Sequence, residues 1–294
     1  MPKEVPVPAL LAPAKLNLTL EVLSRRPDGY HTLRSVMAPL ALYDRIEFEP
    51  AATATFAAGN GAPSGAENLV MRAIAAAGVT QPYQITLHKV IPIGGGLGGG
   101  SSDAAAMLRA AAEGAFGPAP QANWLEIARG LGSDVPFFLS GTAALIEGTG
   151  ERVTPLGALP DWWAVVVQPP VAVATADAYR LLDESRPDGP PSRARNESAS
   201  LRAVDALQRS DFAALERELV NDFHAPMVRA FPALARADEA LRAAAGRSLL
   251  SGSGSCLFAL FESESPAREA AAKIDPSAVQ AVFVCSFHHG PAWR

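Results

Sequence analysis

A run of glycines at residues 94–100 constrains the fold of this 294-residue chain more than any other segment. Six of these seven residues are glycine, and the seventh is Leu97. Such a run is entropically costly to order and offers almost no side chain to bury, so core packing does not explain it. The sequence before it predicts a strand at 83–91, and the sequence after it predicts an alanine-rich helix from Ser101 to about Phe116. The run therefore joins a strand to the start of a helix.

A glycine-rich bend in this position is suited to binding an anion. The N-terminus of a helix carries about half a positive charge and free N–H groups, and glycines let neighbouring N–H groups turn toward a ligand. Ser101 and Ser102 place hydroxyl groups where a phosphate or its Mg²⁺ would lie. A flexible linker, the alternative, would have no strand before it and no helix after it. We therefore expect phosphate to bind at 94–100.

Other kinds of phosphate site fit the sequence poorly. Gly94, Gly96 and Gly99 match the fingerprint of dinucleotide-binding proteins, but that fold requires a second strand ending in an acidic residue about 20 residues later. A second helix is predicted at 121–130 instead. A Walker loop requires a lysine that the run lacks, and the sequence has no His-Arg-Asp loop of the protein-kinase type.

Residues 12–22 alternate strictly between apolar and polar side chains and predict a strand. Lys15 and Asn17 lie on its polar face. A lysine in this place is either a solvated surface residue or the cation that a phosphoryl-transfer site requires, and the strand alone favours the solvated interpretation. An arginine-proline-aspartate-glycine turn follows, and it places Tyr30 and His31 directly after it.

Asp134 is the best candidate for a general base. Phosphoryl transfer depends on positioning and charge stabilisation, with one group that accepts the proton of the attacking hydroxyl. Asp134 stands in a predicted loop at 132–138, where small and apolar residues flank it. An aspartate that only shapes a turn or ends a helix is the alternative, and the local sequence does not decide between the two.

Composition and charge argue against several other classes of protein. The net charge is -5 and no basic stripe is present, so a nucleic-acid partner finds no electrostatic support. The sequence shows no Lys/Arg-rich amphipathic helix, no secretory signal and no uncharged apolar stretch of about 20 residues, which predicts a cytoplasmic protein without membrane contact. Its two cysteines, Cys256 and Cys285, are expected to be reduced core thiols.

Both halves of the chain mix predicted strands and helices with antiparallel hairpins, which indicates an α+β fold rather than a doubly wound sheet. A junction near Pro160 predicts an N-terminal domain at 1–160 and a C-terminal domain at 161–294. Two or three helices are expected at 199–245, and a strand–loop–strand–helix–strand series ends the chain. The segment 184–198, rich in Pro, Gly and Arg, is expected to be an exposed loop and has no functional interpretation.

Three separated motifs resemble those of the GHMP superfamily of small-molecule kinases, which includes galactokinase and the homoserine, mevalonate and phosphomevalonate kinases. They lie at 13–18, at 92–105 and at 251–255. The resemblance implies an N-terminal α+β domain, a ferredoxin-like C-terminal domain and an active site in the cleft between them, with ATP and Mg²⁺ as cofactors. It implies nucleotide contacts at Pro92, Ile93, Gly94, Gly95, Gly96, Leu97, Gly98, Gly99, Gly100, Ser101 and Ser102, with Lys89 and Asn68 near the ribose or base.

The segments 26–33 and 132–138 are similar to one branch of that superfamily, which phosphorylates the 2-hydroxyl of a cytidine-diphosphate-linked sugar alcohol in the non-mevalonate isoprenoid pathway. The match implies that Asp134 is the base and that Lys15 orients the hydroxyl and stabilises developing charge. Tyrosine rings can stack on the cytosine and a histidine can bond its edge. The implied contacts of the cytidine diphosphate part are Asn17, Tyr30, His31, Thr175 and Tyr179.

Three alternatives stay open at this point. A sibling kinase would act on another small alcohol, and would be favoured if Tyr30 and His31 faced away from the cleft. A catalytically inactive sensor could share the fold, although such proteins tend to lose the base or the cation, and Lys15 and Asp134 are both present. A dinucleotide-dependent oxidoreductase ranks last. The expected partners are the sugar-alcohol substrate and ATP, and the chain is expected to be a monomer or a weak homodimer.

Overall fold

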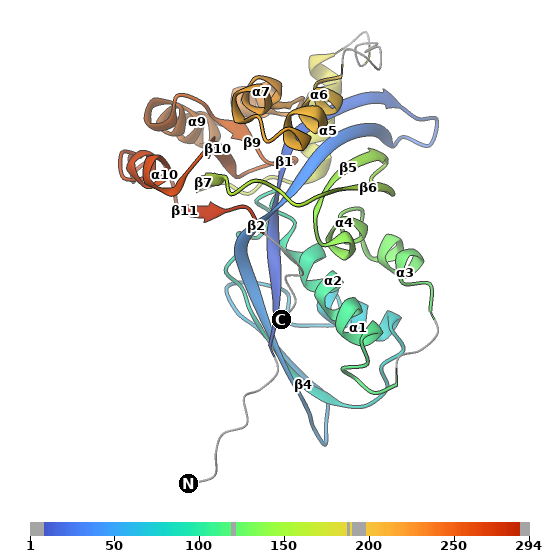
Figure 1. The fold of residues 1–294 in the computed structure, drawn as a ribbon. Helices are drawn as coiled ribbons and strands as arrows, with labels where there is room; N and C mark the ends of the chain where they lie inside the picture. Colours follow the sequence, from blue (N-terminus) through green and yellow to red (C-terminus); the bar gives the residue numbers. More distant parts are fainter. Residues whose placement is uncertain (1–8, 119–121, 187–188, 190–197, 289–294) are drawn as a thin grey trace.

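A long β-hairpin forms the spine of the structure (Figure 1). The computed structural model describes residues 9–118, 122–186, 189 and 198–288. Strand β1 (Ala9–Arg25) pairs antiparallel with β2 (His31–Pro50). The predicted turn joins them: the Gly29 N–H donates to the Arg26 carbonyl at 3.0 Å, and the φ of Gly29, 86°, is one that glycine adopts without strain. The hairpin therefore places His31 at the start of β2.

The hairpin lies inside a seven-stranded sheet in which the strands follow the order β3-β4-β2-β1-β8, while β5 pairs with β2 and β6 pairs with β5. Helices α1 to α4 cover one face of this sheet, where Ile46, Leu87 and Leu108 belong to one buried apolar cluster. The further elements of this part are β3 (Thr55–Ala58), α1 (Leu69–Ala76), β4 (Tyr83–His88), α2 (Gly99–Ala112), α3 (Trp124–Leu131), α4 (Val135–Ser140), β5 (Ala143–Gly148), β6 (Arg152–Gly157) and β8 (Val220–Asn221).

A second, antiparallel sheet has the strand order β11-β7-β10-β9. If the helices between β7 and β9 are counted as one, the strands and helices of this sheet follow the order β-α-β-β-α-β. This order is the ferredoxin-like arrangement. Its elements are β7 (Trp163–Gln168), α5 (Thr175–Ser185), α6 (Ala199–Gln208), α7 (Phe212–Glu218), α8 (His224–Ala230), α9 (Pro232–Ala245), β9 (Leu249–Leu250), β10 (Leu257–Phe261), α10 (Glu264–Ala271) and β11 (Ala281–Ser286).

Both faces of the second sheet are buried, which joins the two parts of the molecule. Along β7 the side chain of Val166 packs into the cluster that contains Leu16 and Leu18 of β1, whereas its neighbours Val165 and Val167 pack into the cluster beneath α9 and α10. Successive side chains of a strand point to opposite faces, so the single apolar run of β7 packs against both clusters. The hairpin therefore packs directly against the C-terminal sheet.

The structure confirms most of the predicted elements and corrects several. Strand β2 extends over 20 residues rather than over 44–49 alone, and β3 was not predicted. A short helix, α4, occupies most of the segment 132–138 that was expected to be a loop, and four helices rather than two or three fill 199–245. Helix α2 begins at Gly99, inside the glycine run, and not at Ser101.

Several predictions about the chain outside the site can be compared with the structure. Cys256 and Cys285 are buried free thiols, as expected. Within the described part of the chain, no helix is long and apolar enough to cross a membrane. The domain boundary at 160/161 stays a prediction; β8 follows it and still joins the N-terminal sheet. Most of the predicted loop at 184–198 lies outside the described residues.

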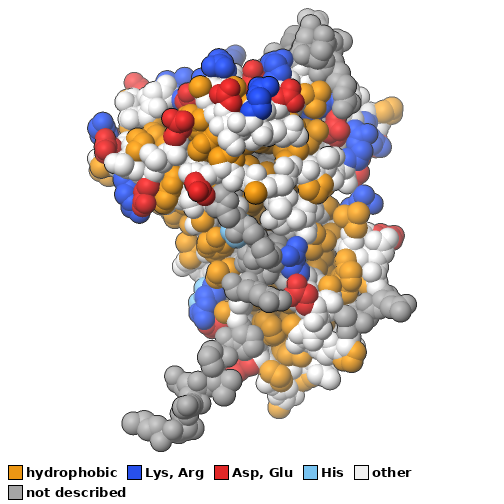
Figure 2. Space-filling view, in the orientation of Figure 1, with side chains coloured by type: hydrophobic (Ala, Val, Ile, Leu, Met, Phe, Trp, Pro, Cys, Tyr) orange, Lys and Arg blue, Asp and Glu red, His pale blue; other side chains and the backbone are white. Residues whose placement is uncertain are grey.

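Acidic and basic side chains are interspersed over the helices of the C-terminal half on the face that Figure 2 shows. Charges of both signs lie next to one another there rather than gathering into one patch. Some charged residues of these helices form ion pairs one helical turn apart, such as Arg268 with Glu264 on α10 and Arg180 with Glu184 on α5. Exposed pairs of this kind add little to stability.

Candidate active site

One cavity of about 1080 Å³ lies where the glycine run, the spine hairpin, α5 and the loop at 251–255 meet. All but one of the site residues predicted from the sequence line it. The exception is Ser102, which is fully buried, and whose hydroxyl is not exposed to the cavity and finds no hydrogen-bond partner among the described residues. The cavity wall includes Lys15, Asn17, Tyr30, His31, Asn68, Lys89, Pro92, Ile93, Gly94, Gly95, Gly96, Leu97, Gly98, Gly99, Gly100, Ser101, Asp134, Thr175 and Tyr179.

The glycine run turns three times through backbone conformations that other residues rarely adopt. Gly94, Gly96 and Gly98 have φ values of 68°, 73° and 72°. Gly98 is the N-cap of α2, and because it has no side chain it caps none of the N–H groups of the first turn. The N–H groups of that turn are therefore open to the cavity, together with the positive end of the helix dipole. This is the geometry that binds an anion at a helix N-terminus.

The loop at 251–255 holds the glycine run from the other side. The Ser255 and Cys256 N–H groups donate to the Gly94 and Gly95 carbonyls at 3.2 and 3.0 Å, and the Ser251 hydroxyl donates to the Gly96 carbonyl at 3.1 Å. Three consecutive carbonyls of the run are thus engaged away from the cavity. A Cβ atom at Gly96 would lie 2.0 Å from the Ser251 carbonyl oxygen, so the two loops touch too closely for any side chain there.

Lys15 and Asp134 face each other beside the glycine run. The Lys15 N–H donates to the Leu97 carbonyl at 3.0 Å, which fixes β1 against the run. Its ammonium group donates to the Asn17 amide oxygen and lies 3.7 Å from the Asp134 carboxylate. Asp134 stands at the N-terminus of α4, but its carboxylate makes no capping hydrogen bond to the helix and so remains available to a ligand.

Burial sets the electrostatics of this pair. The Lys15 side chain is 4% exposed, whereas that of Asp134 is 27% exposed. Burial lowers the pKa of Lys15, because it disfavours the charged ammonium, and the nearby Asp134 opposes the shift only in part. The interpretation of Lys15 as a solvated surface lysine is therefore wrong: the polar face of β1 points into the protein and the cavity, not into solvent.

The far end of the cavity is aromatic. The His31 ring stacks on Tyr179 of α5, with centroids 4.8 Å apart and ring planes 18° apart. The His31 Nε2 atom also lies 2.9 Å from the Asp183 carboxylate. Tyr30 is 69% exposed, and the ring contacts of Tyr179 are with His31 and Phe223 rather than with Tyr30. Thr175, at the start of α5, shares a hydrogen bond of 3.0 Å with Ser253 of the loop at 251–255.

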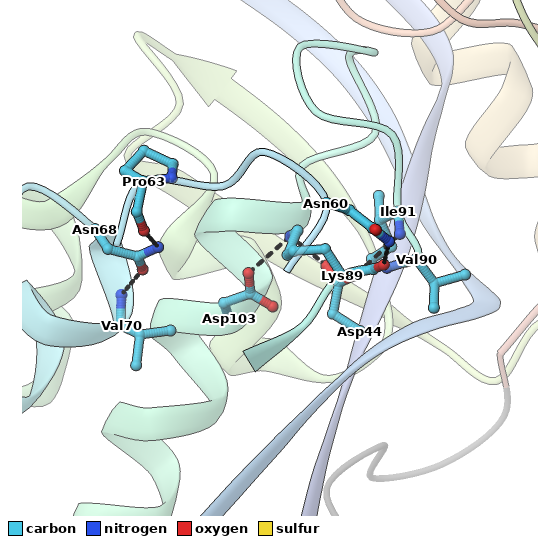
Figure 3. A network of polar contacts seen from close by, with 9 residues as sticks. All are labelled: Asp44, Asn60, Pro63, Asn68, Val70, Lys89, Val90, Ile91 and Asp103. Carbon is cyan, nitrogen blue, oxygen red and sulfur yellow. Dashed lines mark hydrogen bonds and ion pairs between the residues drawn. The ribbon is translucent and has the colours of Figure 1, made fainter. Parts of the chain in front are cut away.

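Lys89 lies in a buried ionic network beneath the glycine run (Figure 3). Its ammonium group donates to the carboxylates of Asp44 and Asp103, to the latter at 2.8 Å. Asp44 also accepts from the N–H groups of Val90 and Ile91 at 2.6 and 2.9 Å, which fixes the chain that enters the run. Burial and the neighbouring Asp44 raise the pKa of Asp103 to about 7, against the opposing effect of Lys89.

Asn68 likewise uses its side chain within the protein. Its amide oxygen caps α1 by accepting from the Val70 N–H at 2.9 Å, and its amide nitrogen donates to the Pro63 carbonyl at 2.8 Å (Figure 3). Asn68 and Lys89 both line the cavity, but the polar atoms of both side chains already have partners. That Asn68 and Lys89 lie near the ribose or base of ATP therefore stays a prediction.

Comparisons with known proteins show the family of this chain. The model of the GHMP kinases N terminal domain matches residues 68–142, and that of the GHMP kinases C terminal domain matches residues 203–280. The 4-diphosphocytidyl-2-C-methyl-D-erythritol kinase of Pelotomaculum thermopropionicum is 42% identical over 274 residues, which cover 90% of this chain and 92% of the relative. The chain belongs to the 4-diphosphocytidyl-2-C-methyl-D-erythritol kinase family.

Solved structures agree with this membership. A crystal structure of 4-(cytidine 5'-diphospho)-2C-methyl-D-erythritol kinase superposes with a TM-score of 0.78 at 40% identity, covering 96% of this chain and all of that one. The homoserine kinase of Cytophaga hutchinsonii superposes with a TM-score of 0.65 at 18% identity, over 99% of this chain and 97% of its own, and shows the shared GHMP kinase fold alone. Membership in this kinase family removes the dinucleotide-dependent oxidoreductase as an alternative.

Sequence reasoning missed four polar residues that support the candidate site. Asp44 and Asp103 hold Lys89, and Asp183 holds His31. Asn221 of β8 donates to the Leu250 and Gly252 carbonyls at 2.7 and 2.8 Å and so holds the loop at 251–255. Of these, only Asp103 lies within a recognised motif, and the contacts described here join residues that are between 14 and 152 positions apart in the sequence.

Proposed function

We propose that the protein transfers the γ-phosphoryl group of ATP to the 2-hydroxyl of 4-diphosphocytidyl-2-C-methyl-D-erythritol. The observation that carries the proposal is that a single cavity joins three parts: the anion-binding glycine run, the Lys15–Asp134 pair and the aromatic end with His31 and Tyr179. A triphosphate, an attacking hydroxyl and a pyrimidine base require such parts in one place. The names of the relatives supply the identity of the acceptor.

The glycine run would bind the β- and γ-phosphates of ATP through the N–H groups at the start of α2. Lys15, held by Asn17 and fixed to the run through Leu97, would orient the acceptor hydroxyl and stabilise the negative charge that develops on the transferred group. The hydroxyl oxygen forms a bond to the γ-phosphorus while the bond from that phosphorus to the β–γ bridging oxygen breaks, and ADP leaves. The hydroxyl proton passes to the Asp134 carboxylate.

Mg²⁺ belongs to the proposal through the chemistry of phosphoryl transfer. The described residues contain no group of three or more His, Cys, Asp or Glu side chains that could hold a metal ion by themselves. Mg²⁺ in kinases is usually held by one or two protein oxygens together with substrate phosphates and water, so such a group is not required. Ser101, next to the segment that carries Asp134, offers one oxygen. When bound, the ion would neutralise charge on the phosphates.

The sibling-kinase alternative differs in the acceptor. It would be favoured if the aromatic residues faced away from the cleft, yet Tyr30 and His31 both line the cavity. An inactive sensor is disfavoured because the Lys15 ammonium and the Asp134 carboxylate lie only 3.7 Å apart.

A coupled assay that follows ADP release tests the proposal. The purified protein would be given ATP and Mg²⁺ with 4-diphosphocytidyl-2-C-methyl-D-erythritol, mevalonate or homoserine, each in a separate reaction. We expect turnover with the cytidylyl substrate alone, and a product that carries one new phosphate on the 2-hydroxyl. Faster turnover with mevalonate or homoserine would support a sibling kinase, and no turnover with any acceptor would support the inactive sensor.

A further inference from the structure

We propose that Asp183 is a specificity-determining positioning residue: it holds the His31 imidazole in the orientation that recognises the pyrimidine of the acceptor substrate. The inference rests on the proposed function, because it takes His31 as the contact of the cytosine edge. Asp183 lies on α5, outside every motif that identifies the family, and 152 residues from His31 in the sequence. It lines the same cavity as His31.

Two contacts from α5 fix the His31 ring. Stacking on Tyr179, at 4.8 Å and 18°, sets the plane of the imidazole, and the hydrogen bond of 2.9 Å between Nε2 and Asp183 sets its rotation within that plane. Tyr179 and Asp183 are four residues apart, so one face of the helix presents both groups. His31 is 8% exposed, so contacts with the protein rather than with solvent determine the position of its ring.

The contact with Asp183 also decides which ring nitrogen meets the substrate. A carboxylate accepts hydrogen bonds, so the Nε2 atom that faces it carries the hydrogen. Nδ1 makes no hydrogen bond to any of the described residues and is therefore the nitrogen that remains for a ligand. The partner of one imidazole nitrogen thus defines the role of the other, as it does for histidines that bind metals.

A fixed imidazole can distinguish cytosine from uracil. The exocyclic amine of cytosine is a hydrogen-bond donor, whereas the oxygen at the same position of uracil is an acceptor, as it is in thymine. An imidazole that is free to flip and to change tautomer can offer either a donor or an acceptor, and so adapts to both bases. Loss of Asp183 should therefore weaken the binding of cytosine and reduce the preference for cytosine over uracil.

Apart from its bond to His31, Asp183 has one further ion pair among the described residues, which is weak, and this makes the inference testable by substitution. Its second carboxylate oxygen lies 4.0 Å from the Arg25 guanidinium, in a pair whose side chains are 63% and 38% exposed. Exposed pairs of this kind contribute little. Asp177, on the same helix, forms a similar exposed pair with Arg180 and does not line the cavity, so it provides a matched control.

The experiment compares the native protein with Asp183→Ala, Asp183→Asn and the control Asp177→Asn. It measures kcat, the KM of each substrate, the melting temperature, and the inhibition constants of CDP and UDP. We expect Asp183→Ala to raise the KM of the cytidylyl substrate about tenfold, the effect of one hydrogen bond to a charged group, and to reduce the CDP/UDP preference. The KM of ATP and the melting temperature should stay unchanged. Asp183→Asn, which keeps an acceptor oxygen, should have a smaller effect, and Asp177→Asn none.

The outcomes separate this inference from the function on which it rests. If the native protein binds CDP and Asp183→Ala keeps the native CDP/UDP preference, the role of Asp183 is overturned and the proposed function stands. An equal rise in the KM of both substrates, or a lower melting temperature without a change in preference, would mean that Asp183 is structural, which also overturns the inference. If the native protein binds neither CDP nor UDP, the proposed function itself fails.

Discussion

Lys15 combines two properties that a surface lysine lacks. It is buried, so that its pKa is lowered, and three neighbours on three different segments fix its position: Asn17, Leu97 and Asp134. A cation held in a poorly solvated place acts more strongly on a developing negative charge than the same cation in water. In the proposed reaction these contacts hold the ammonium group in place before the acceptor hydroxyl binds.

Substitution of the proposed base tests the role of this pair. Asp134→Asn should lower kcat by about 10²–10⁴-fold, the usual contribution of a general base, while ATP binding stays close to native. The fold should tolerate the change, because the Asp134 carboxylate makes no capping bond to α4. Steady-state kinetics, nucleotide titration and a melting curve check the three parts. A variant that retained near-native turnover would mean that Asp134 has only a structural role.

The limits of the sequence are clearest at single residues. Lys15 and Asp134 lie in motifs and could be identified from them. The alternating pattern of the strand that carries Lys15 shows only that one face of the strand is polar. It does not show whether that face meets solvent or a cleft. The contacts of Asp183 and Asn221 could not be predicted at all, because they join segments that are brought together only by the tertiary fold.

At the scale of elements, the two glycine-rich loops act as one unit. Residues 251–256 donate hydrogen bonds to three successive carbonyls of the run, so the position of the N–H groups proposed to bind phosphate depends on them. A side chain at Gly96 would break that contact, because its Cβ would lie 2.0 Å from the Ser251 carbonyl oxygen, a backbone atom that cannot rotate away.

Gly96→Ala should therefore lower the melting temperature and raise the KM of ATP by about tenfold or more. The matched control is Gly78→Ala, at a glycine with a similar φ of 71° but with nothing within 4 Å of its Cβ position. Gly78→Ala should cost only the strain of an alanine at a positive φ, about 1–2 kcal/mol. It should leave the KM of ATP unchanged. Thermal melts and kinetics on both variants check this. Equal effects of the two substitutions would show that the contact between the loops is unimportant.

The buried network under the run predicts a pH dependence of stability. The pKa of Asp103 is raised from 3.8 to about 7 in the folded protein, mainly by burial. Between these values the folded state keeps a proton that the unfolded state has lost, so the free energy of unfolding falls as the pH rises, by at most about 1.4 kcal/mol per pH unit for one proton. Below pH 3.8 both states are protonated, and the effect is absent.

Asp103→Asn removes this titration and keeps the shape of the side chain. Urea unfolding at several pH values between 4 and 7 should give a flatter dependence for the variant than for the native protein. Lys89 retains Asp44 as its partner in the variant, so the network is not left with an unpaired cation. The same slope in both proteins would mean that Asp103 does not hold its proton in this range.

Elements with a strong local signal were predicted well, and those fixed by tertiary contacts were not. The strand and helix on either side of the glycine run follow from periodicity and turn residues. Helix α4 was missed because it has only six residues and an apolar run with no helical period. Strand β2 was predicted too short because its burial on both faces removes the alternation that marks a half-buried strand.

At the scale of the whole molecule, the site exists because the hairpin spine packs against both halves. Strand β1 carries Lys15 beside the run, its partner β2 begins with His31, and the C-terminal half supplies α5 and the loop at 251–255 (Figure 1). Each half alone holds only part of the machinery. The cavity is lined by residues from both halves of the chain.

A crystal structure with a non-hydrolysable ATP analogue and 4-diphosphocytidyl-2-C-methyl-D-erythritol measures the arrangement directly. We expect the triphosphate on the N–H groups of the glycine run and the 2-hydroxyl within about 3 Å of the Asp134 carboxylate. Lys15 should lie beside the γ-phosphate, and the cytosine edge should contact His31. A triphosphate bound elsewhere in the cavity, or a 2-hydroxyl out of reach of Asp134, would contradict the proposal.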